Sequence, residues 1–385
     1  MCFALVYFLP SSSSFAPPLA SRADTAITAS LSAADLLYQD QQDALLRRAL
    51  HEQAIIQSHA KNGVLESLVA PKVKAVANAG TGFASASSKS SDVRIAQQRA
   101  KMVNKDGVLR IDSVLSTETC DALRNYVLDQ QKIAQKATDA NADLSMIYYG
   151  VENRRKGRCD LQLSLLRGGF ERDCNGGDCN EQGSILADSL NQLLGERGTL
   201  RHLYEQLVTT SGEFYELAAV ITDPGSNRQT IHPDLPWKPV APLYVIFLAL
   251  QDVTVEMGPT CFLTGSQSEK INELFNCGNT SQKDDVLTKS TARLSTLKQG
   301  DCVLFDARIL HCGNANESSE TRALFNFSFR NPAVTGDLGY KGSIRPGYEG
   351  KMTLKDVHDA SVAYEGGDMD PFAKYGNGMK KASRY

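Results

Sequence analysis

The sequence lacks a long apolar run, a strong charge of either sign and a regular cysteine pattern. No stretch reaches the roughly 20 apolar residues that a membrane-spanning helix requires, so we expect no transmembrane segment. The 385 residues carry a formal net charge of −3, which offers no electrostatic footprint for a nucleic acid. A content of 42% hydrophobic and 22% charged residues is ordinary for a globular protein, and the length suffices for one large domain or two modest ones.

The cysteines do not form a framework that could organise the fold. The nine cysteines include no Cys-x-x-Cys pair, and their odd number argues against a complete set of disulfides. Cys174 and Cys179 form the one local pair. Two reduced thiols in a glycine-rich surface loop are the expected state, and a disulfide or redox switch is the alternative.

What the sequence does contain is a His-x-Asp pair followed by a distant histidine. His232 and Asp234 flank Pro233, and residues i and i+2 of an extended strand end project to the same face. His311 follows a short apolar strand, residues 301–306, that begins after a Gln-Gly turn. Two histidines and one carboxylate are the ligands of a facial triad for non-haem Fe(II). The pattern therefore predicts a metal site.

A further charged residue, Arg322, opens the next predicted strand after His311. This strand, residues 322–329, alternates well enough to be half buried. A guanidinium fixed at its start could hold the far carboxylate of a dicarboxylate cosubstrate through parallel hydrogen bonds.

Each motif also has a less specific interpretation. His-Pro-Asp is the loop signature of J-domain co-chaperones, but the strand-like flanks lack the two basic amphipathic helices of that domain. A lone His311 would be taken as a core histidine. Zinc hydrolysis with the same ligands lacks a nearby carboxylate to act as general base. The joint occurrence of the ligand types and Arg322 favours the iron interpretation.

In combination these residues resemble the phytanoyl-CoA dioxygenase-like Fe(II)/2-oxoglutarate oxygenases. The resemblance covers residues 100–335 and includes the His-x-Asp pair, the small-residue stretch at 258–266, Gly300-Asp301, Phe305-Asp306-Ala307-Arg308, His311, Asn316 and Arg322. Gln267 stands where the family commonly has a histidine.

The resemblance implies cofactors, roles and a reaction. His232, Asp234 and His311 would hold Fe(II). Arg322 would bind the distal carboxylate of 2-oxoglutarate, and O2 would be the other reactant. Decarboxylation to succinate and CO2 would drive hydroxylation, desaturation or oxidative cyclisation at an unactivated C–H bond of a small metabolite. A non-catalytic cupin-like metal- or ligand-binding module and a protein-modifying oxygenase remain open alternatives.

Four residues are candidates for substrate binding. Trp237, the only tryptophan, either lines the pocket or is a plain core aromatic. The basic cluster of Arg154, Arg155 and Arg158 either receives an acidic or CoA-like substrate at the cavity mouth or forms a solvated face. Neither the substrate nor the oligomeric state follows from these residues.

The strand pattern predicts the fold class. Short strands between residues 214 and 329, separated by Gly/Pro/Asn loops, favour an α+β fold with a mainly β core, a double-stranded β-helix (jelly roll, cupin-like) with flanking helices. We expect the dioxygenase domain over residues 93–335. An amphipathic helix and a Ser/Gly-rich linker at 31–92 are expected to be dispensable for catalysis, and residues 336–385 to form an irregular extension. Helices are expected at 93–104, 116–131 and 183–208.

Residues 1–30 have the composition of a targeting segment. A short apolar run precedes an acid-poor, Ser/Ala-rich stretch that contains arginine. The Ser-Phe-Ala-Pro piece within it resembles the bipartite signal and transit peptides of diatom-type algae. We therefore expect import into a secondary plastid, with secretion or a cytoplasmic location as alternatives. A plastid location would narrow the substrate to pigment, isoprenoid or kainoid-like specialised metabolism.

Overall fold

The computed structural model describes residues 33–60, 66–67, 86–153, 157–165, 184–345 and 347–376. The predictions made for residues 1–30, for Arg154 and Arg155, and for Cys174 and Cys179 lie outside the described residues. Across the described ranges, no helix combines the length and apolar character needed to cross a membrane.

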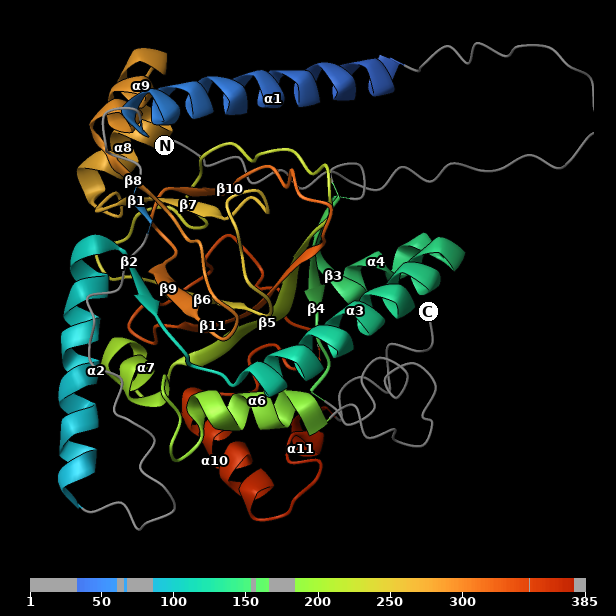
Figure 1. Cartoon of the computed structure of the whole chain (residues 1–385), viewed down its shortest axis with the longest axis vertical. Coiled ribbons are helices and arrows are strands. Elements are labelled where there is room, and N and C mark those ends of the chain that lie inside the picture. The colour runs from blue at the N-terminus through green and yellow to red at the C-terminus, as the bar shows by residue number, and fades with distance from the viewer. Residues whose placement is uncertain are drawn as a thin grey trace, which may run out of the picture.

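The core consists of two β-sheets (Figure 1). The larger sheet has the strand order β2-β9-β6-β11-β5-β4-β3, and neighbouring strands are antiparallel. Its strands are β2 (Val108–Ile111), β3 (Tyr149–Asn153), β4 (Arg158–Gln162), β5 (Glu213–Thr222), β6 (Leu243–Ala249), β9 (Cys302–Asp306) and β11 (Arg322–Arg330). The smaller sheet has the order β1-β8-β7-β10, formed by β1 (Glu66–Ser67), β8 (Thr291–Leu294), β7 (Thr260–Thr264) and β10 (His311–Gly313).

The inner faces of the two sheets pack on each other. Phe262 of β7 meets Phe305 of β9 with ring centroids 5.1 Å apart, and both side chains are fully buried. Val245, Leu243 and Leu324 extend this apolar layer along the larger sheet. The predicted fold class is confirmed: an α+β chain with a mainly β core of the double-stranded β-helix type and flanking helices.

Helices cover the outer face of the larger sheet (Figure 1). They are α2 (Ala86–Asp106), α3 (Thr117–Ala140), α6 (Ser184–Leu194), α7 (Arg201–Val208) and α10 (Leu354–Glu365), and the shorter η1 (Ala142–Leu144), α4 (Ser145–Tyr148) and α11 (Ala373–Gly376) accompany them. Phe325, Phe327 and Phe329 of β11 point into this helical layer. Strand β11 is therefore buried on both faces, whereas we expected it to be half buried, because the helices exclude water from the face that alternation alone would leave exposed.

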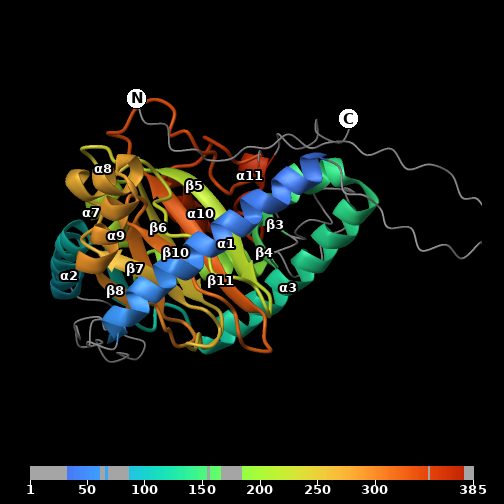
Figure 2. The same cartoon turned by 90° about the horizontal axis from the view of Figure 1, so that it is seen from above.

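Three helices lie on the smaller sheet: α1 (Ala33–Ala60), α8 (Glu269–Cys277) and α9 (Thr280–Lys289). Figure 2 shows α1 running across this side of the molecule, over β10 and β7. Ile56 of α1 joins a core cluster with Leu263, Phe275 and Val286. The helix that we expected before the linker is thus packed against the domain.

Three helix predictions need correction. The segment 183–208 forms two helices, because the chain turns back through Gly198, where a Cβ would lie 2.5 Å from the Leu193 carbonyl oxygen. Helix α2 begins at Ala86, inside the predicted linker, and α3 starts at its predicted Ser116 cap but continues to Ala140.

The C-terminal extension, predicted to be irregular, contains α10. A capping box between Thr353 and Asp356 starts this helix. Leu354, Val357 and Phe372 are buried in the helical layer, so the segment completes the core instead of merely covering it.

Candidate metal centre and its cavity

His232 and His311 are paired through their backbones. The amide of His232 donates to the carbonyl of His311 at 3.0 Å, and the amide of His311 donates back at 2.9 Å. Two residues that exchange both bonds are directly opposed in an antiparallel ladder, so their side chains leave on the same face. The imidazole centroids are 4.8 Å apart. The bridge brings together two histidines that are far apart in the chain.

Both imidazoles are oriented by a backbone carbonyl. Nδ1 of His232 lies 2.8 Å from the carbonyl oxygen of Thr230, and Nδ1 of His311 lies 3.0 Å from that of Ile309. Since a carbonyl only accepts, Nδ1 carries the proton in each ring and Nε2 keeps its lone pair. This is the usual support of a metal-binding histidine.

Asp234 supplies the third donor. Its Oδ1 lies 3.9 Å from Nε2 of His232 and 3.5 Å from Nε2 of His311, and one donor atom of each residue lies within 4.8 Å of the others. Burial raises the pKa of Asp234 to about 6 and lowers the pKa of His311 to about 4. At neutral pH the imidazoles are neutral and the carboxylate is charged, as ligation requires. This set of two nitrogens and one oxygen fits Fe(II).

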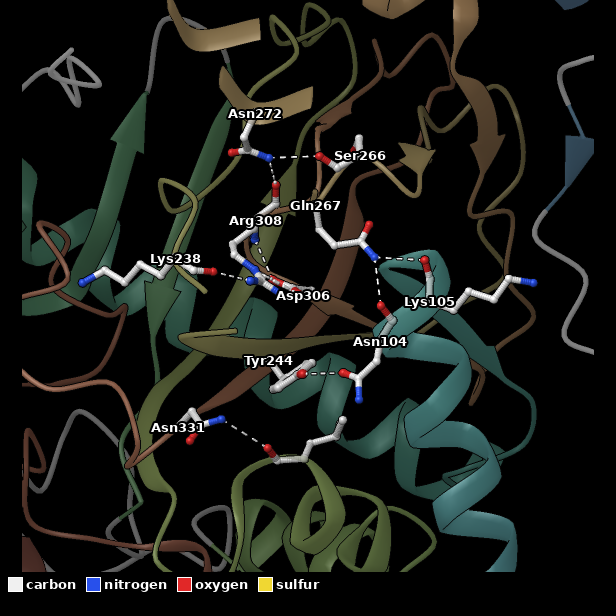
Figure 3. Close-up of polar contacts among 11 residues, drawn as sticks. Asn104, Lys105, Lys238, Tyr244, Ser266, Gln267, Asn272, Asp306, Arg308 and Asn331 are labelled. Atoms are coloured by element: carbon white, nitrogen blue, oxygen red, sulfur yellow. Dashed lines mark hydrogen bonds and ion pairs between the residues drawn. The ribbon is translucent and has the colours of Figure 1, made fainter. Parts of the chain in front are cut away.

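The turn before His311 is held by side chains from the β7–α8 region. Oγ of Ser266 accepts a hydrogen bond of 2.8 Å from the Leu310 amide. The amide nitrogen of Asn272 donates to the carbonyl oxygens of Ser266 and Arg308, at 2.9 and 3.0 Å (Figure 3). These bonds fix the backbone of the residue that precedes the ligand.

The same turn is tied to the segment that carries the other two ligands. The Arg308 guanidinium pairs with the carboxylate of Asp306 and donates to the carbonyl oxygen of Lys238 (Figure 3). Lys238 follows Asp234 in the same loop, so one side chain links the two ligand-bearing segments. Asp306 and Arg308 belong to the motif that resembles the family, and the link from Asp306 through Arg308 to Lys238 gives them a structural role.

Gln267 serves helix α2 and not the metal. Its Nε2 donates to the carbonyl oxygens of Asn104 and Lys105, at 3.2 and 3.1 Å (Figure 3). These are unpaired acceptors of the last turn of α2. A histidine expected at this position by family resemblance is replaced here by an amide that caps a helix.

Helix α1 reaches the metal segment from behind. Glu52, only 2% exposed, accepts a hydrogen bond of 2.8 Å on Oε2 from the Ile231 amide. Arg228, also buried, donates to the carbonyl oxygen of Ala49 at 2.9 Å and to Oδ1 of Asn314 at 3.0 Å. The segment that leads to His232 is therefore clamped between α1 and β10.

Arg322 lies at the start of β11, as predicted, and is fully buried. Its guanidinium donates to the Gly258 carbonyl oxygen and, at 3.0 Å, to Oγ1 of Thr222. Arg158 of β4 donates to the same hydroxyl at 3.3 Å. Burial lowers the pKa of Arg322 to about 9 and that of Arg158 to about 10, and the two cations repel each other. Among the described residues no carboxylate forms an ion pair with either guanidinium.

One cavity of about 920 Å³ connects these groups. The three metal ligands, Arg322, Arg158 and Trp237 all line it. Of the predicted substrate residues, Trp237 and Arg158 thus reach the cavity, while Arg154 and Arg155 lie outside the described residues.

The acidic part of this lining was not predicted from the sequence. Asp160 of β4, Glu216 of β5 and Tyr340 face the same cavity. Period-2 alternation along the strands would have placed Asp160 on the face of Arg158, and Glu216 on the face of Thr222. Nothing in the sequence alone distinguished that inner face from a solvated one.

A family model for phytanoyl-CoA dioxygenase (PhyH) matches residues 103–324. The chain belongs to the phytanoyl-CoA dioxygenase family. The cofactors of such an enzyme are iron and 2-oxoglutarate, and the donor set of His232, Asp234 and His311 suits the metal. The match spans the metal segment and ends inside β11, just after Arg322.

Several solved structures are similar to this chain at low sequence identity. The non-haem α-ketoglutarate-dependent epimerase SnoN of nogalamycin biosynthesis is 14% identical, with a TM-score of 0.41 over 64% of this chain and 90% of that one. AviO1 from Streptomyces viridochromogenes Tue57 is 16% identical, with a TM-score of 0.40 over 63% and 97%. The carbocyclase SnoK is 14% identical, with a TM-score of 0.38 over 61% and 83%. No curated relative matches the chain.

Proposed function

We propose that this protein is an Fe(II)- and 2-oxoglutarate-dependent dioxygenase that oxidises an unactivated C–H bond of a small molecule. The observation that carries the proposal is the convergence of two Nε2 atoms and one carboxylate oxygen in the same cavity as a buried arginine. Family membership supports the cofactors, and the chain's own residues support their placement.

In this proposal His232, Asp234 and His311 bind the metal. Their support is already built: carbonyls orient both rings, and the Arg308 and Glu52 contacts fix the two segments. Preorganised ligands leave little to be ordered when the ion arrives. When bound, iron and 2-oxoglutarate would supply the oxidising chemistry, in which 2-oxoglutarate, O2 and the substrate are converted into succinate, CO2 and the oxidised product.

The cosubstrate 2-oxoglutarate binds where Arg158 and Arg322 line the cavity. Arg158, Thr222 and Arg322 are register partners across β4, β5 and β11. One buried and one half-buried guanidinium, neither in an ion pair with a carboxylate among the described residues, favour an anion. A dicarboxylate is the anion that the family uses. Arg322 pairs with the distal carboxylate of 2-oxoglutarate, and Arg158 adds a second positive charge beside this carboxylate. Arg158 therefore serves the cosubstrate and does not bind an acyl-CoA substrate at the cavity mouth.

The size of the cavity supports a small-molecule substrate. Its volume of about 920 Å³ lies in the upper range of sites for small molecules. Trp237 and Phe247 give it apolar walls near the metal ligands. Hydroxylation, desaturation and cyclisation all begin with hydrogen removal in such a pocket, so the residues that hold the substrate decide the outcome.

The test is an anaerobic titration of the full chain with Fe(II) and 2-oxoglutarate, following the weak visible absorption band of their complex. We expect saturable appearance of the band, at least tenfold weaker 2-oxoglutarate binding in Arg322→Gln, and partial recovery in Arg322→Lys. Arg330→Gln is the matched control, because Arg330 ends the same strand and pairs with Glu213 at 3.7 Å. Absence of the band at saturating metal would leave a cupin-like binding module as the function.

The targeting composition of residues 1–30 supports a proposed site of action in a plastid. A fusion of this segment to a fluorescent protein, imaged in an alga with a secondary plastid, tests this part separately.

A further inference from the structure

The inner face of the larger sheet changes charge along its length. Reading down β4 and β5, the row of Arg158 and Thr222 is followed by Asp160 opposite Val220. After the row of Gln162, Ala218 and Asn326 comes Glu216 opposite Ser328 of β11. These side chains share one face because alternate residues of neighbouring strands point the same way. The cavity thus has a basic part, with Arg158 and Thr222, and an acidic part, with Asp160 and Glu216, and these four residues all line it.

The acidic part is organised by hydrogen bonds. Tyr340 donates to Oε1 of Glu216 at 2.5 Å and lies 3.3 Å from Oγ of Ser343. The Ser343 hydroxyl also donates to Oδ2 of Asp160 at 3.5 Å. Tyr340 and Ser343 therefore hold the carboxyl groups of Glu216 and Asp160 in defined positions near each other.

Two acceptors in this region have no hydrogen-bond partner among the described residues. Oε2 of Glu216, which is 4% exposed, and Oδ1 of Asn326, which is 3% exposed, are buried without a hydrogen bond. Both residues line the cavity. Within the described ranges no arginine, lysine or histidine forms an ion pair with Asp160 or Glu216. Contacts from Ser328 and from the Ser343 backbone offset only part of the burial of Glu216, because its pKa stays raised. A buried acceptor without a donor is costly, so this wall is suited to donors from a ligand.

The rest of the cavity indicates which donors are needed. Iron with Asp234 leaves one positive charge, and 2-oxoglutarate balances Arg158 and Arg322. Ionised Asp160 and Glu216 would then leave the filled site with one excess negative charge. Burial raises the pKa of both carboxyl groups, that of Asp160 to about 7, and so disfavours their ionised forms in the empty cavity. A cation bound beside them would reverse this effect by favouring the carboxylates.

We propose that the acidic wall formed by Asp160 and Glu216 binds the protonated amino group of the substrate. The proposal rests on the proposed function and names its substrate class: an organic amine whose ammonium group is held by this wall while its C–H bond faces the metal. An ammonium offers three donors to the carboxylates and the Asn326 amide oxygen. A second metal ion is not supported, because the one group of three potential ligands among the described residues is His232, Asp234 and His311.

Trp237 makes the binding measurable without iron. It is the only tryptophan in the chain and lines the cavity. The metal-free full chain is titrated with alkylamines from propyl to octyl and with the matched neutral alcohols. Tryptophan fluorescence and calorimetry are followed together, so that a silent fluorophore does not hide binding. We expect the amines to bind at least tenfold more tightly than the alcohols of equal length.

Isosteric variants locate the effect. Asp160→Asn and Glu216→Gln should each weaken amine binding at least tenfold and leave alcohol binding unchanged. Glu269→Gln is the matched control, because Glu269 is an exposed carboxylate at the cavity mouth. Circular dichroism checks that each variant is folded. If one of the two variants does not fold, the other decides the test.

The outcomes separate this proposal from the proposed function. Equal binding of amines and alcohols, or amine binding that both variants retain, overturns the amine proposal even when the Fe(II)–2-oxoglutarate band is present. Selective amine binding that the variants abolish supports the amine site even when the band is absent, in which case the dioxygenase function fails alone.

Discussion

Oε2 of Glu52 accepts a hydrogen bond of 2.8 Å from the backbone amide of Ile231, the residue immediately before His232. The two residues are 179 positions apart, and the bond joins helix α1 to the metal segment. Removing the carboxylate leaves a buried amide without an acceptor, at a cost of about 1–3 kcal/mol. We expected α1 to be dispensable for catalysis, and this contact predicts instead that metal binding depends on it.

Glu52→Ala should therefore weaken Fe(II) binding about tenfold, the lower end of the effects seen when groups behind metal ligands are removed. Isothermal titration under anaerobic conditions measures this. His51→Gln is the control, because His51 of the same helix contacts Asp284 of α9 and does not touch the metal segment. Unchanged Fe(II) affinity in Glu52→Ala would show that the bond is structural only.

Metal removal should lower the melting temperature of the wild-type protein. Fe(II) at about 100 times its dissociation constant stabilises the folded state by about 2.7 kcal/mol if it binds that state alone. Asp234→Ala removes one ligand and should abolish the difference between iron-loaded and chelator-treated samples in thermal denaturation. A variant that keeps the full iron-dependent increase would rule out Asp234 as a ligand.

Thr222 should matter to the cosubstrate and not to the metal. Its hydroxyl accepts from Arg322 at 3.0 Å and from Arg158 at 3.3 Å. Thr222→Val keeps the shape and removes the acceptor that the two guanidiniums share, while Arg322 keeps its bond to Gly258 and Arg158 its bonds to Asn227 and Asn314. We therefore expect several-fold weaker 2-oxoglutarate binding with unchanged Fe(II) affinity. The two titrations on one preparation give both values, and an equal loss in both would indicate general disruption.

The stability of the metal-free protein should depend on pH through Asp160. Burial, followed by repulsion from Glu216, raises the pKa of Asp160 to about 7 from an ordinary value of 3.8. The folded state therefore binds the proton more tightly than the unfolded state, and stability is lost as pH rises from about 4 to about 7. Asp160→Asn carries no charge to bury. Its melting temperature should exceed that of the wild type at pH 8, and the gain should shrink at pH 5.

The metal ligands could be predicted because their chemistry restricts the residue types. His232, Asp234 and His311 are recognisable in sequence, and the apolar strand before His311 indicated which segments would meet. The strands of the core were found for the same reason, since β-branched and aromatic runs between turn residues are local signals.

The groups around the ligands could not be predicted, because their roles depend on contacts between distant segments. Glu52 looks like any charged residue of an amphipathic helix, and only the packing of α1 reveals its bond to Ile231. Asp160 and Glu216 look like solvent-facing residues of alternating strands. Helix α10 was missed because its amphipathic signal is weak within a Gly- and Lys-rich segment, and its burial comes from tertiary packing.

The pairing of the metal segment with β10 has a consequence for behaviour in solution. Strand β10 is the terminal strand of the smaller sheet, and its outer edge is occupied by the segment that carries His232 through bonds at Gln229, His232 and His311. An uncovered strand edge is a template for pairing with another chain. If this segment loosens when the metal is lost, bound iron would also prevent the edge of β10 from pairing with another chain. The chelator-treated, metal-free protein would then be the form that aggregates.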